Sequence, residues 1–228
     1  MEQTIKVAAV MTAPRYELTY ARNNIEKACQ ALGIRLIVSQ GVFYGQCMQT
    51  MLEKLVGEAD YAITIDFDSL FTVDHMQRLL RTIDSRPEID ALAALQIRRS
   101  KPTMLGTVEG GEIKEGTDKK EIVVTGDPIK GETAHFGLTA IDLKKLANVP
   151  KPWFWAKPNS DGRWDTDKVD DDVHFWLQWK AAGNSIYFDP MVRIGHIEEM
   201  VVMHDENLKP IHVYPAQWES MQNASRAC

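Results

Sequence analysis

The stretch YAITIDFD, residues 61–68, decides the fold that this sequence predicts. Its first five residues are aromatic, apolar or β-branched, and they predict a buried β-strand. The strand runs directly into Asp66-Phe67-Asp68, so two carboxylates lie two residues apart at the point where it ends. Because open α/β sheets bind ligands at the carboxyl ends of their strands, the stretch predicts a sheet and a site at its edge.

Strand patterns alternate with helix patterns on both sides of this stretch. Short apolar runs predict strands, and apolar residues spaced three or four apart predict helices. The predicted strands are 5–11, 34–39, 61–65 and 89–97, and the predicted helices are 19–32, 45–58 and 73–84. This alternation indicates an α/β, Rossmann-like fold, in which helices flank a mostly parallel central sheet.

The second half of the chain has shorter and more varied patterns. Glycines in residues 103–125 predict a hairpin or mobile excursion. Further on, the sequence predicts a strand over 133–141 with a short helix after it, a loop over 150–167, a helix over 169–182, strands over 185–188 and 192–194, and an irregular tail over 201–228. A smaller, β-rich portion is therefore expected beside the main sheet.

Composition excludes several classes of protein. The 228 residues are 44% hydrophobic and 25% charged, which is ordinary for a globular protein, and 26 basic against 32 acidic residues give a net charge of −6. That charge argues against a broad surface for nucleic acid or anionic membrane. Cys29, Cys47 and Cys228 do not form a disulfide framework, so we expect reduced thiols in a cytoplasmic protein. No run approaches the roughly 18 apolar residues of a membrane span.

Asp66 and Asp68 are candidate ligands of Mn²⁺ or Mg²⁺. Such ions prefer carboxylate oxygens together with substrate phosphates, and they neutralise a diphosphate leaving group. The alternative is that these are turn aspartates that cap the following helix. His196, which follows Gly195 and a short strand, is the candidate third ligand, with a structural histidine as the alternative.

Asp170-Asp171-Asp172 begins a predicted helix and carries a candidate general base. Acids at a helix start cap it and complement its dipole, which explains part of the run. Clustered carboxylates also raise one another's pKa, and this suits a base that deprotonates an acceptor hydroxyl near neutral pH. Asp172 is the first candidate and Asp171 the second.

Other strand ends add candidate nucleotide contacts, because parallel strands end at one edge of a sheet. Thr12, Pro14 and Arg15 follow the first strand, Phe67 lies between the two aspartates, and Arg98 follows the fourth strand.

His135 precedes Phe136-Gly137 and is a candidate contact of the diphosphate or the acceptor. A bulge in a strand is the alternative.

The tryptophans fall into two groups. Trp176 and Trp179 are three residues apart on a predicted helix and are expected in the core. Trp153 and Trp155 lie in a proline-rich loop, where they either stack on a sugar or base ring or pack in the core.

Taken together, these segments resemble the GT-A fold glycosyltransferases, especially the glycosyltransferase family 2-like group. The resemblance covers roughly residues 5–196 and rests on the order of five segments. They are Pro14-Arg15, Asp66-Phe67-Asp68, Phe136-Gly137 with Ile141-Asp142, Asp171-Asp172-Val173-His174-Phe175, and 182–190 with Gly195-His196. The sequence departs from the family at Asp171-Asp172, where Glu-Asp is frequent.

The resemblance implies a UDP- or GDP-sugar donor, with Mn²⁺ or Mg²⁺ held by Asp66, Asp68 and His196. Asp172 is then the base of an inverting transfer to the hydroxyl of a saccharide or another acceptor, with a retaining transfer as the alternative. It also implies one GT-A-like catalytic domain over residues 1–200, with a nucleotide-binding half (1–100) and an acceptor-side half (101–200), followed by a C-terminal tail (201–228).

Two other functions stay open. A sugar-phosphate nucleotidyltransferase shares the strand–helix alternation, but its triphosphate loop usually contains glycine, and residues 12–15 contain none. A non-catalytic module that binds nucleotide sugars would need the pocket and not the base. A modified base in DNA also remains open as an acceptor.

Overall fold

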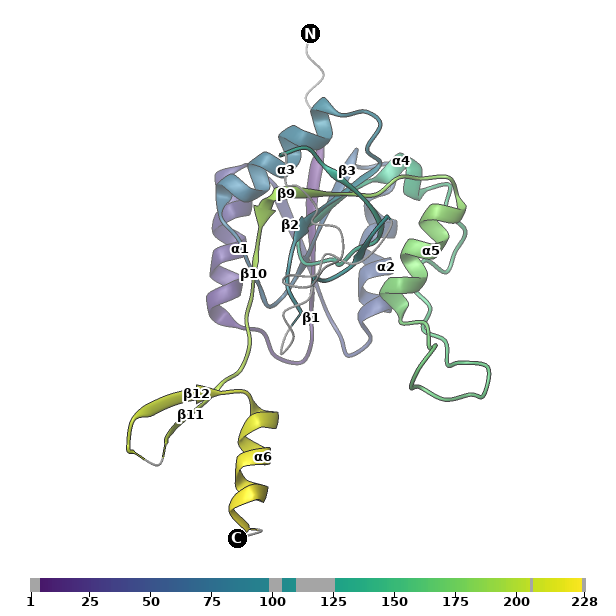
Figure 1. Cartoon of the computed structure of the whole chain (residues 1–228). Coiled ribbons are helices and arrows are strands. Elements are labelled where there is room, and N and C mark those ends of the chain that lie inside the picture. Colours follow the sequence, from purple (N-terminus) through teal and green to yellow (C-terminus); the bar gives the residue numbers. More distant parts are fainter. Residues whose placement is uncertain (1–4, 99–103, 110–125, 206, 227–228) are drawn as a thin grey trace.

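The computed structural model describes residues 5–98, 104–109, 126–205 and 207–226, and it shows an eight-stranded sheet flanked by helices (Figure 1). The strand order is β2-β1-β3-β8-β5-β9-β7-β6. The strands are β1 (Val7–Ala13), β2 (Arg35–Gln40), β3 (Tyr61–Asp66), β5 (Ala91–Leu95), β6 (Thr107–Val108), β7 (Ile129–Thr133), β8 (Thr139–Asp142) and β9 (Tyr187–Arg193). The helices around the sheet are α1 (Thr19–Ala31), α2 (Tyr44–Leu55), α3 (Val73–Ser85), α4 (Leu143–Leu146) and α5 (Asp171–Ala181).

The first half of the chain folds as the sequence predicts, with element ends shifted by a few residues. β1 pairs in parallel with β2 on one side and with β3 on the other, and β5 pairs in parallel with β9. These five strands share one direction, whereas β8 and β7 run against them. The sheet is therefore mixed. Separately, no helix in the described part of the chain is long and apolar enough to span a membrane.

The predicted strand over residues 133–141 is a strand only at its two ends: β7 ends at Thr133 and β8 begins at Thr139, and these two strands lie in different parts of the sheet. β8 lies between β3 and β5, and β7 lies beyond β9. The chain bends between them because two side chains bond to local backbone: Gly137 N–H donates to His135 Nδ1 (2.9 Å), and Thr139 Oγ1 donates to the His135 carbonyl (2.7 Å). Such bonds compete with strand pairing, and an apolar run does not reveal them.

Two hydrophobic clusters fill the two faces of the sheet. One lies under α1 and α3, and the other lies under α2 and α5. The second contains the predicted core residues Trp176 and Trp179, both fully buried. Phe136 stacks on Trp176 with ring centroids 5.3 Å apart, and Phe154 stacks on Phe175 at 5.0 Å. Each such side chain contributes roughly 1.5–3 kcal/mol by leaving water, so this aromatic cluster holds the start of α5 firmly against the sheet.

The C-terminal tail contains regular structure and is not irregular as predicted. β11 (Val201–His204) pairs with β12 (Pro210–Val213), and α6 (Pro215–Arg226) follows. The Asp205 carboxylate accepts from Lys209 N–H at the turn (2.8 Å). Figure 1 shows the hairpin and α6 extending away from the sheet.

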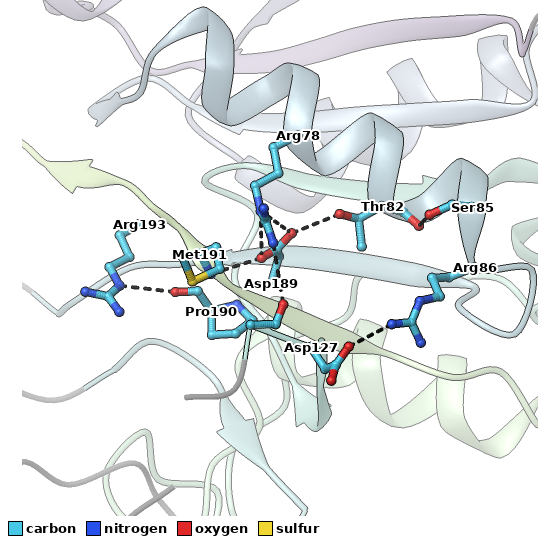
Figure 2. A network of polar contacts seen from close by, with 10 residues as sticks. Arg78, Thr82, Ser85, Arg86, Asp127, Asp189, Pro190, Met191 and Arg193 are labelled. Atoms are coloured by element: carbon cyan, nitrogen blue, oxygen red, sulfur yellow. Dashed lines mark hydrogen bonds and ion pairs between the residues drawn. The ribbon is translucent and has the colours of Figure 1, made fainter. Parts of the chain in front are cut away.

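β9 is a single strand where the sequence predicts two, and a buried carboxylate fixes it to α3. The pairing of β9 with β5 shifts register between Asp189 and Arg193, at Pro190, which has no N–H to donate. Asp189 is fully buried and accepts from Arg78 Nε (3.1 Å) and Thr82 Oγ1 (3.0 Å) on α3 (Figure 2). This contact sets the course of the chain that leads directly to His196.

Asp189→Ala is expected to destabilise the fold by roughly 2–4 kcal/mol, because it leaves Arg78, Thr82 and the Met191 N–H without their shared acceptor. Urea unfolding of the two proteins measures the difference. The exposed pair Arg86–Asp127 (2.8 Å) supplies a matched control, since Asp127→Ala should cost less than about 1 kcal/mol. Equal losses in the two variants would contradict a structural role for Asp189.

Candidate active site

The strand ends that the sequence places together do share one edge of the sheet. β1, β2, β3, β5 and β9 run in the same direction, so their carboxyl ends lie along this edge. Thr12 is buried and pairs directly with Asp66, the last residue of β3. Pro14 is half-buried, and Arg15 and Arg98 are exposed. These side chains stay predicted nucleotide contacts at the edge where the aspartates lie.

Asp68 and His196 form the most clearly built part of the site. The short strand β10 (Gly195–His196) pairs antiparallel with β4 (Ser69–Leu70), which follows Asp68. The Ile197 N–H also donates to the Asp68 carbonyl (2.9 Å). These backbone bonds bring His196 Nε2 to 3.2 Å from Asp68 Oδ2, although the residues are 128 positions apart.

The other ring nitrogen fixes the orientation of His196. Nδ1 lies 3.0 Å from the Ile97 carbonyl oxygen, and a carbonyl only accepts, so Nδ1 carries a proton. Nε2 is thereby directed toward the Asp68 carboxylate. Metal-binding histidines have this arrangement, in which the second nitrogen donates to a backbone carbonyl.

The aspartates do not cap the helix that follows them. Thr72 is the N-cap of α3: its Oγ1 accepts from His75 N–H (3.2 Å), and Thr72 N–H donates to His75 Nδ1 (3.4 Å). Asp68 lies four residues earlier and is buried, with 3% of its surface exposed. The capping alternative is therefore excluded for this pair of aspartates, and the burial of Asp68 calls for another explanation.

The donor atoms fit a divalent cation that a substrate helps to bind. One carboxylate and one imidazole suit Mn²⁺, and such ions commonly take the rest of their ligands from water and substrate phosphates. Within the described ranges, no group of three histidine, cysteine or acidic side chains is placed to hold a metal. The structure thus brings together two of the three predicted ligands, Asp68 and His196, and leaves Asp66 beside them at the end of β3.

Tyr44, a partly buried tyrosine, is affected by the charges of Asp66 and of the acids that begin α5. Burial, followed by the charges of Asp66, Asp172 and Asp171, raises the pKa of the Tyr44 hydroxyl well above its ordinary value. Tyr44 begins α2, and its ring packs edge-on against Phe136 and Phe154. The charges of the predicted metal motif and of the predicted base thus act on one side chain, Tyr44, which the sequence reasoning missed.

Asp172 and Asp171 differ in their surroundings. Burial is the main cause that raises the pKa of Asp172, with smaller contributions from Asp171 and Asp170. Asp172 Oδ1 accepts from Val173 N–H (2.7 Å), and Asp171 Oδ1 accepts from Asp172 N–H (3.0 Å). Both acids thus satisfy backbone donors of the first helical turn. The carboxylate with the raised pKa is the one that the sequence names first as the base.

Gly45 explains how α2 and α5 come so close together. A Cβ at this position would lie 2.7 Å from Phe154 Cβ and 2.8 Å from Asp171 Oδ2. Glycine within a helix costs about 0.5–1 kcal/mol relative to alanine, so its presence at the second position of α2 indicates a close approach. That unfavourable residue was the available sequence signal for this side of the site.

His135 has a structural role in this geometry. The ring is buried; Nε2 lies 2.7 Å from the Ala94 carbonyl, and Nδ1 accepts from Gly137 N–H. Neither nitrogen is left to bind a phosphate, which corrects the prediction that His135 contacts the diphosphate or the acceptor. Gly137 is needed because a Cβ there would collide with Gln96 Oε1 and Ser69 Oγ.

His135 is expected to make the fold sensitive to acid. Its burial lowers the pKa of the ring from 6.5 to about 4. The unfolded chain therefore takes up a proton at a pH where the folded chain does not, so stability is lost as the pH falls from 6.5 to 4. The loss approaches about 3 kcal/mol.

An NMR titration of the His135 ring protons, assigned with His135→Gln, tests this expectation. A midpoint near 4 supports the structural role, and a midpoint near 6.5 contradicts it.

Comparison with known proteins identifies the fold. The sequence matches no protein-family model and no curated protein. The structure is similar to the protein A197 from STIV, with a TM-score of 0.60 and 11% identity over 92% of this chain and 94% of A197.

Two solved glycosyltransferases are also similar. The mannosyltransferase PcManGT from Pyrobaculum calidifontis, solved with GDP-Man and Mn²⁺, gives a TM-score of 0.51 and 12% identity over 84% of this chain and 56% of its own. Residues 1–349 of S. aureus TarS, solved with UDP-GlcNAc, give a TM-score of 0.51 and 11% identity over 86% of this chain and 59% of that chain. The chain thus spans less than two thirds of either enzyme chain, and it has the α/β fold of GT-A glycosyltransferases.

Proposed function

We propose that this chain transfers a sugar from a UDP- or GDP-sugar to an acceptor hydroxyl, and that Mn²⁺ or Mg²⁺ assists it. The observation that carries the proposal is the contact of His196 Nε2 with Asp68 Oδ2, 3.2 Å apart, just after the end of β3. On the other side, Tyr44 lines one groove with Asp171, the acid next to the first candidate base. A site that needs both a cation and a base is supported by this arrangement, within a fold that sugar transferases share.

On the donor side, Asp68 and His196 would hold the metal, with Asp66 beside them. The bound ion supplies positive charge that neutralises the departing diphosphate. Thr12, Pro14, Arg15, Phe67 and Arg98, at the ends of β1, β3 and β5, would contact the nucleotide. Asp68 is nearly buried and held by backbone pairing of β4 with β10, so its carboxylate is oriented before a ligand arrives.

On the acceptor side, Asp172 would act as the general base. It takes the proton of the acceptor hydroxyl while that oxygen forms a bond to the anomeric carbon of the donor sugar. The bond from this carbon to the diphosphate oxygen breaks, and the nucleoside diphosphate leaves with the electron pair. One displacement of this kind inverts the configuration at the anomeric carbon. The raised pKa of Asp172 brings its basicity closer to what proton transfer near neutral pH needs.

A thermal-shift screen tests the donor class. UDP, GDP, CDP, ADP and their sugars are each added with Mn²⁺ and with EDTA, since a ligand raises the melting temperature according to its concentration relative to Kd. A shift that depends on Mn²⁺ and on one nucleoside diphosphate is expected. A shift with nucleoside triphosphates alone would favour a nucleotidyltransferase, and no shift with any compound would refute the proposal.

A further inference from the structure

A groove of about 750 Å³ lies between the start of α2, the loop before α5 and the start of α5. The described residues that line it are Val42, Phe43, Tyr44, Gly45, Gln46, Gln49, Thr50, Pro152, Phe154, Trp155, Ala156, Asp170 and Asp171. The groove therefore shares Tyr44 and Asp171 with the proposed catalytic site, and a molecule bound in it lies next to Asp171, the second candidate base and the neighbour of Asp172.

Aromatic side chains form both a rigid wall and an exposed rim. Tyr44 and Phe154 pack edge to face, with centroids 6.0 Å apart, and belong to the buried aromatic cluster. Phe43 and Trp155 are 64% and 53% exposed, although both are large and apolar. Trp153, two residues away, is instead buried and donates from Nε1 to the Val149 carbonyl (2.9 Å). Trp153 therefore packs in the core, and Trp155 is the one of these two tryptophans that a ligand can reach.

The charge of the groove excludes whole classes of ligand. The described residues that line it include the carboxylates of Asp170 and Asp171 and no lysine or arginine. Lys168, outside the lining, forms an ion pair with Asp170 (2.8 Å), so Asp171 contributes most of the negative charge of the groove. A phosphate-bearing molecule, whether a nucleotide, a nucleic acid or a lipid phosphate, would bring negative charge toward these carboxylates. Phosphate recognition instead uses basic side chains or backbone N–H groups. The groove is therefore unsuited to the donor diphosphate and to DNA.

We propose that this groove binds a neutral saccharide, and that this saccharide is the acceptor. A sugar ring has an apolar face of C–H groups, which can lie on Phe43 or Trp155, and a rim of hydroxyls. Carboxylates and amides along the groove, those of Asp171 and Gln46 among them, are the polar groups that hydroxyls need. The inference rests on the proposed function and deepens it, because it replaces an undefined hydroxyl acceptor with a chemical class.

The proposed chemistry places one saccharide hydroxyl beside the acids at the start of α5. That hydroxyl gives its proton to Asp172, and its oxygen bonds to the anomeric carbon of the donor sugar as the nucleoside diphosphate leaves. Trp155 is a binding residue in this scheme and takes no part in proton transfer. Its loss should therefore weaken acceptor binding while donor binding stays intact.

Saturation-transfer NMR on the whole chain tests the proposal with cellobiose, maltose, lactose and diacetylchitobiose as probes, in the presence of Mn²⁺ and the nucleoside diphosphate that the thermal screen selects. Glucose 6-phosphate and a short single-stranded DNA are the anionic comparisons. We expect at least one neutral disaccharide to bind, and Trp155→Ala to weaken that binding by about tenfold or more. Trp164→Ala is the matched control, since Trp164 is 59% exposed on the same loop and does not line the groove.

The outcomes separate this inference from the proposed function. Equal weakening by both tryptophan variants, unchanged binding in Trp155→Ala, or binding of the anionic probes alone would overturn the saccharide groove. No binding of any neutral probe would overturn it as well. Each variant is also tested for the metal-dependent thermal shift with nucleotide. If that shift persists while saccharide binding fails, only the groove assignment falls, whereas a missing shift in the unaltered protein refutes the transferase itself.

Discussion

Asp172→Asn is expected to reduce sugar transfer by about 10²–10⁴-fold while donor affinity stays unchanged. The amide oxygen can still accept from Val173 N–H, so the helix start should keep its structure. What the variant lacks is the ability to take a proton from the attacking hydroxyl. Release of nucleoside diphosphate from the donor sugar measures the rate, and the thermal shift with donor and Mn²⁺ measures binding.

Asp74→Asn is the matched control for this experiment. Asp74 lies in the first turn of α3 and is exposed, so the change removes one acid from a helix start away from the proposed base. We expect its rate to stay within a few-fold of the unaltered protein. A rate for Asp172→Asn as high as that of the control would exclude Asp172 as the base, and Asp171→Asn would then test the second candidate.

Asp68→Ala is expected to weaken metal-dependent binding of the nucleotide sugar by at least about 100-fold, equivalent to about 2.7 kcal/mol. The change removes the carboxylate 3.2 Å from His196 Nε2, one of the two predicted ligands that the structure joins. The measurement is the thermal shift with donor and Mn²⁺ relative to EDTA, because loss of metal affinity removes the difference between those two conditions.

Two further variants distinguish a loss of metal binding from a folding defect. Asp68→Asn keeps the volume of the buried side chain and should show the same loss of metal dependence. Asp161→Ala removes an exposed carboxylate from the loop before α5 and should leave the shift unchanged. Unchanged donor affinity in Asp68→Ala with Mn²⁺ present would remove Asp68 from the metal site.

Backbone contacts hold His196, the other member of this pair, in position. Its Nδ1 contacts the Ile97 carbonyl (3.0 Å), and β10 pairs with β4 through backbone hydrogen bonds. The Asp189 network that holds β9 against α3 lies a few residues before it (Figure 2). The fold therefore positions the histidine. His196 should stay in place when Asp68 is changed, so the Asp68 variants report on metal binding.

The sequence by itself determined the elements of the first half and the carboxylates at their ends. Apolar runs such as residues 61–65 leave water only as buried strands, and helical spacing supplies the faces that cover them. Parallel strands that share a direction end at one edge, so the sequence alone predicts that Asp66 and Thr12 lie at the same edge of the sheet. The resemblance to GT-A glycosyltransferases followed from the order of these segments, and the structure confirms the fold.

Only the tertiary structure decided which polar side chains meet. His196 follows Gly195 and His135 lies two residues before Gly137, yet His135 is bonded to backbone on both nitrogens whereas His196 faces Asp68. Trp153 and Trp155 share a loop, yet one is buried and the other rims a groove. The Ala94 carbonyl that fixes His135 lies 41 positions away, and the Asp68 carboxylate that His196 faces lies 128 positions away. Periodicity within a segment carries no information about such contacts. Local patterns fix elements, whereas packing between distant elements fixes the site.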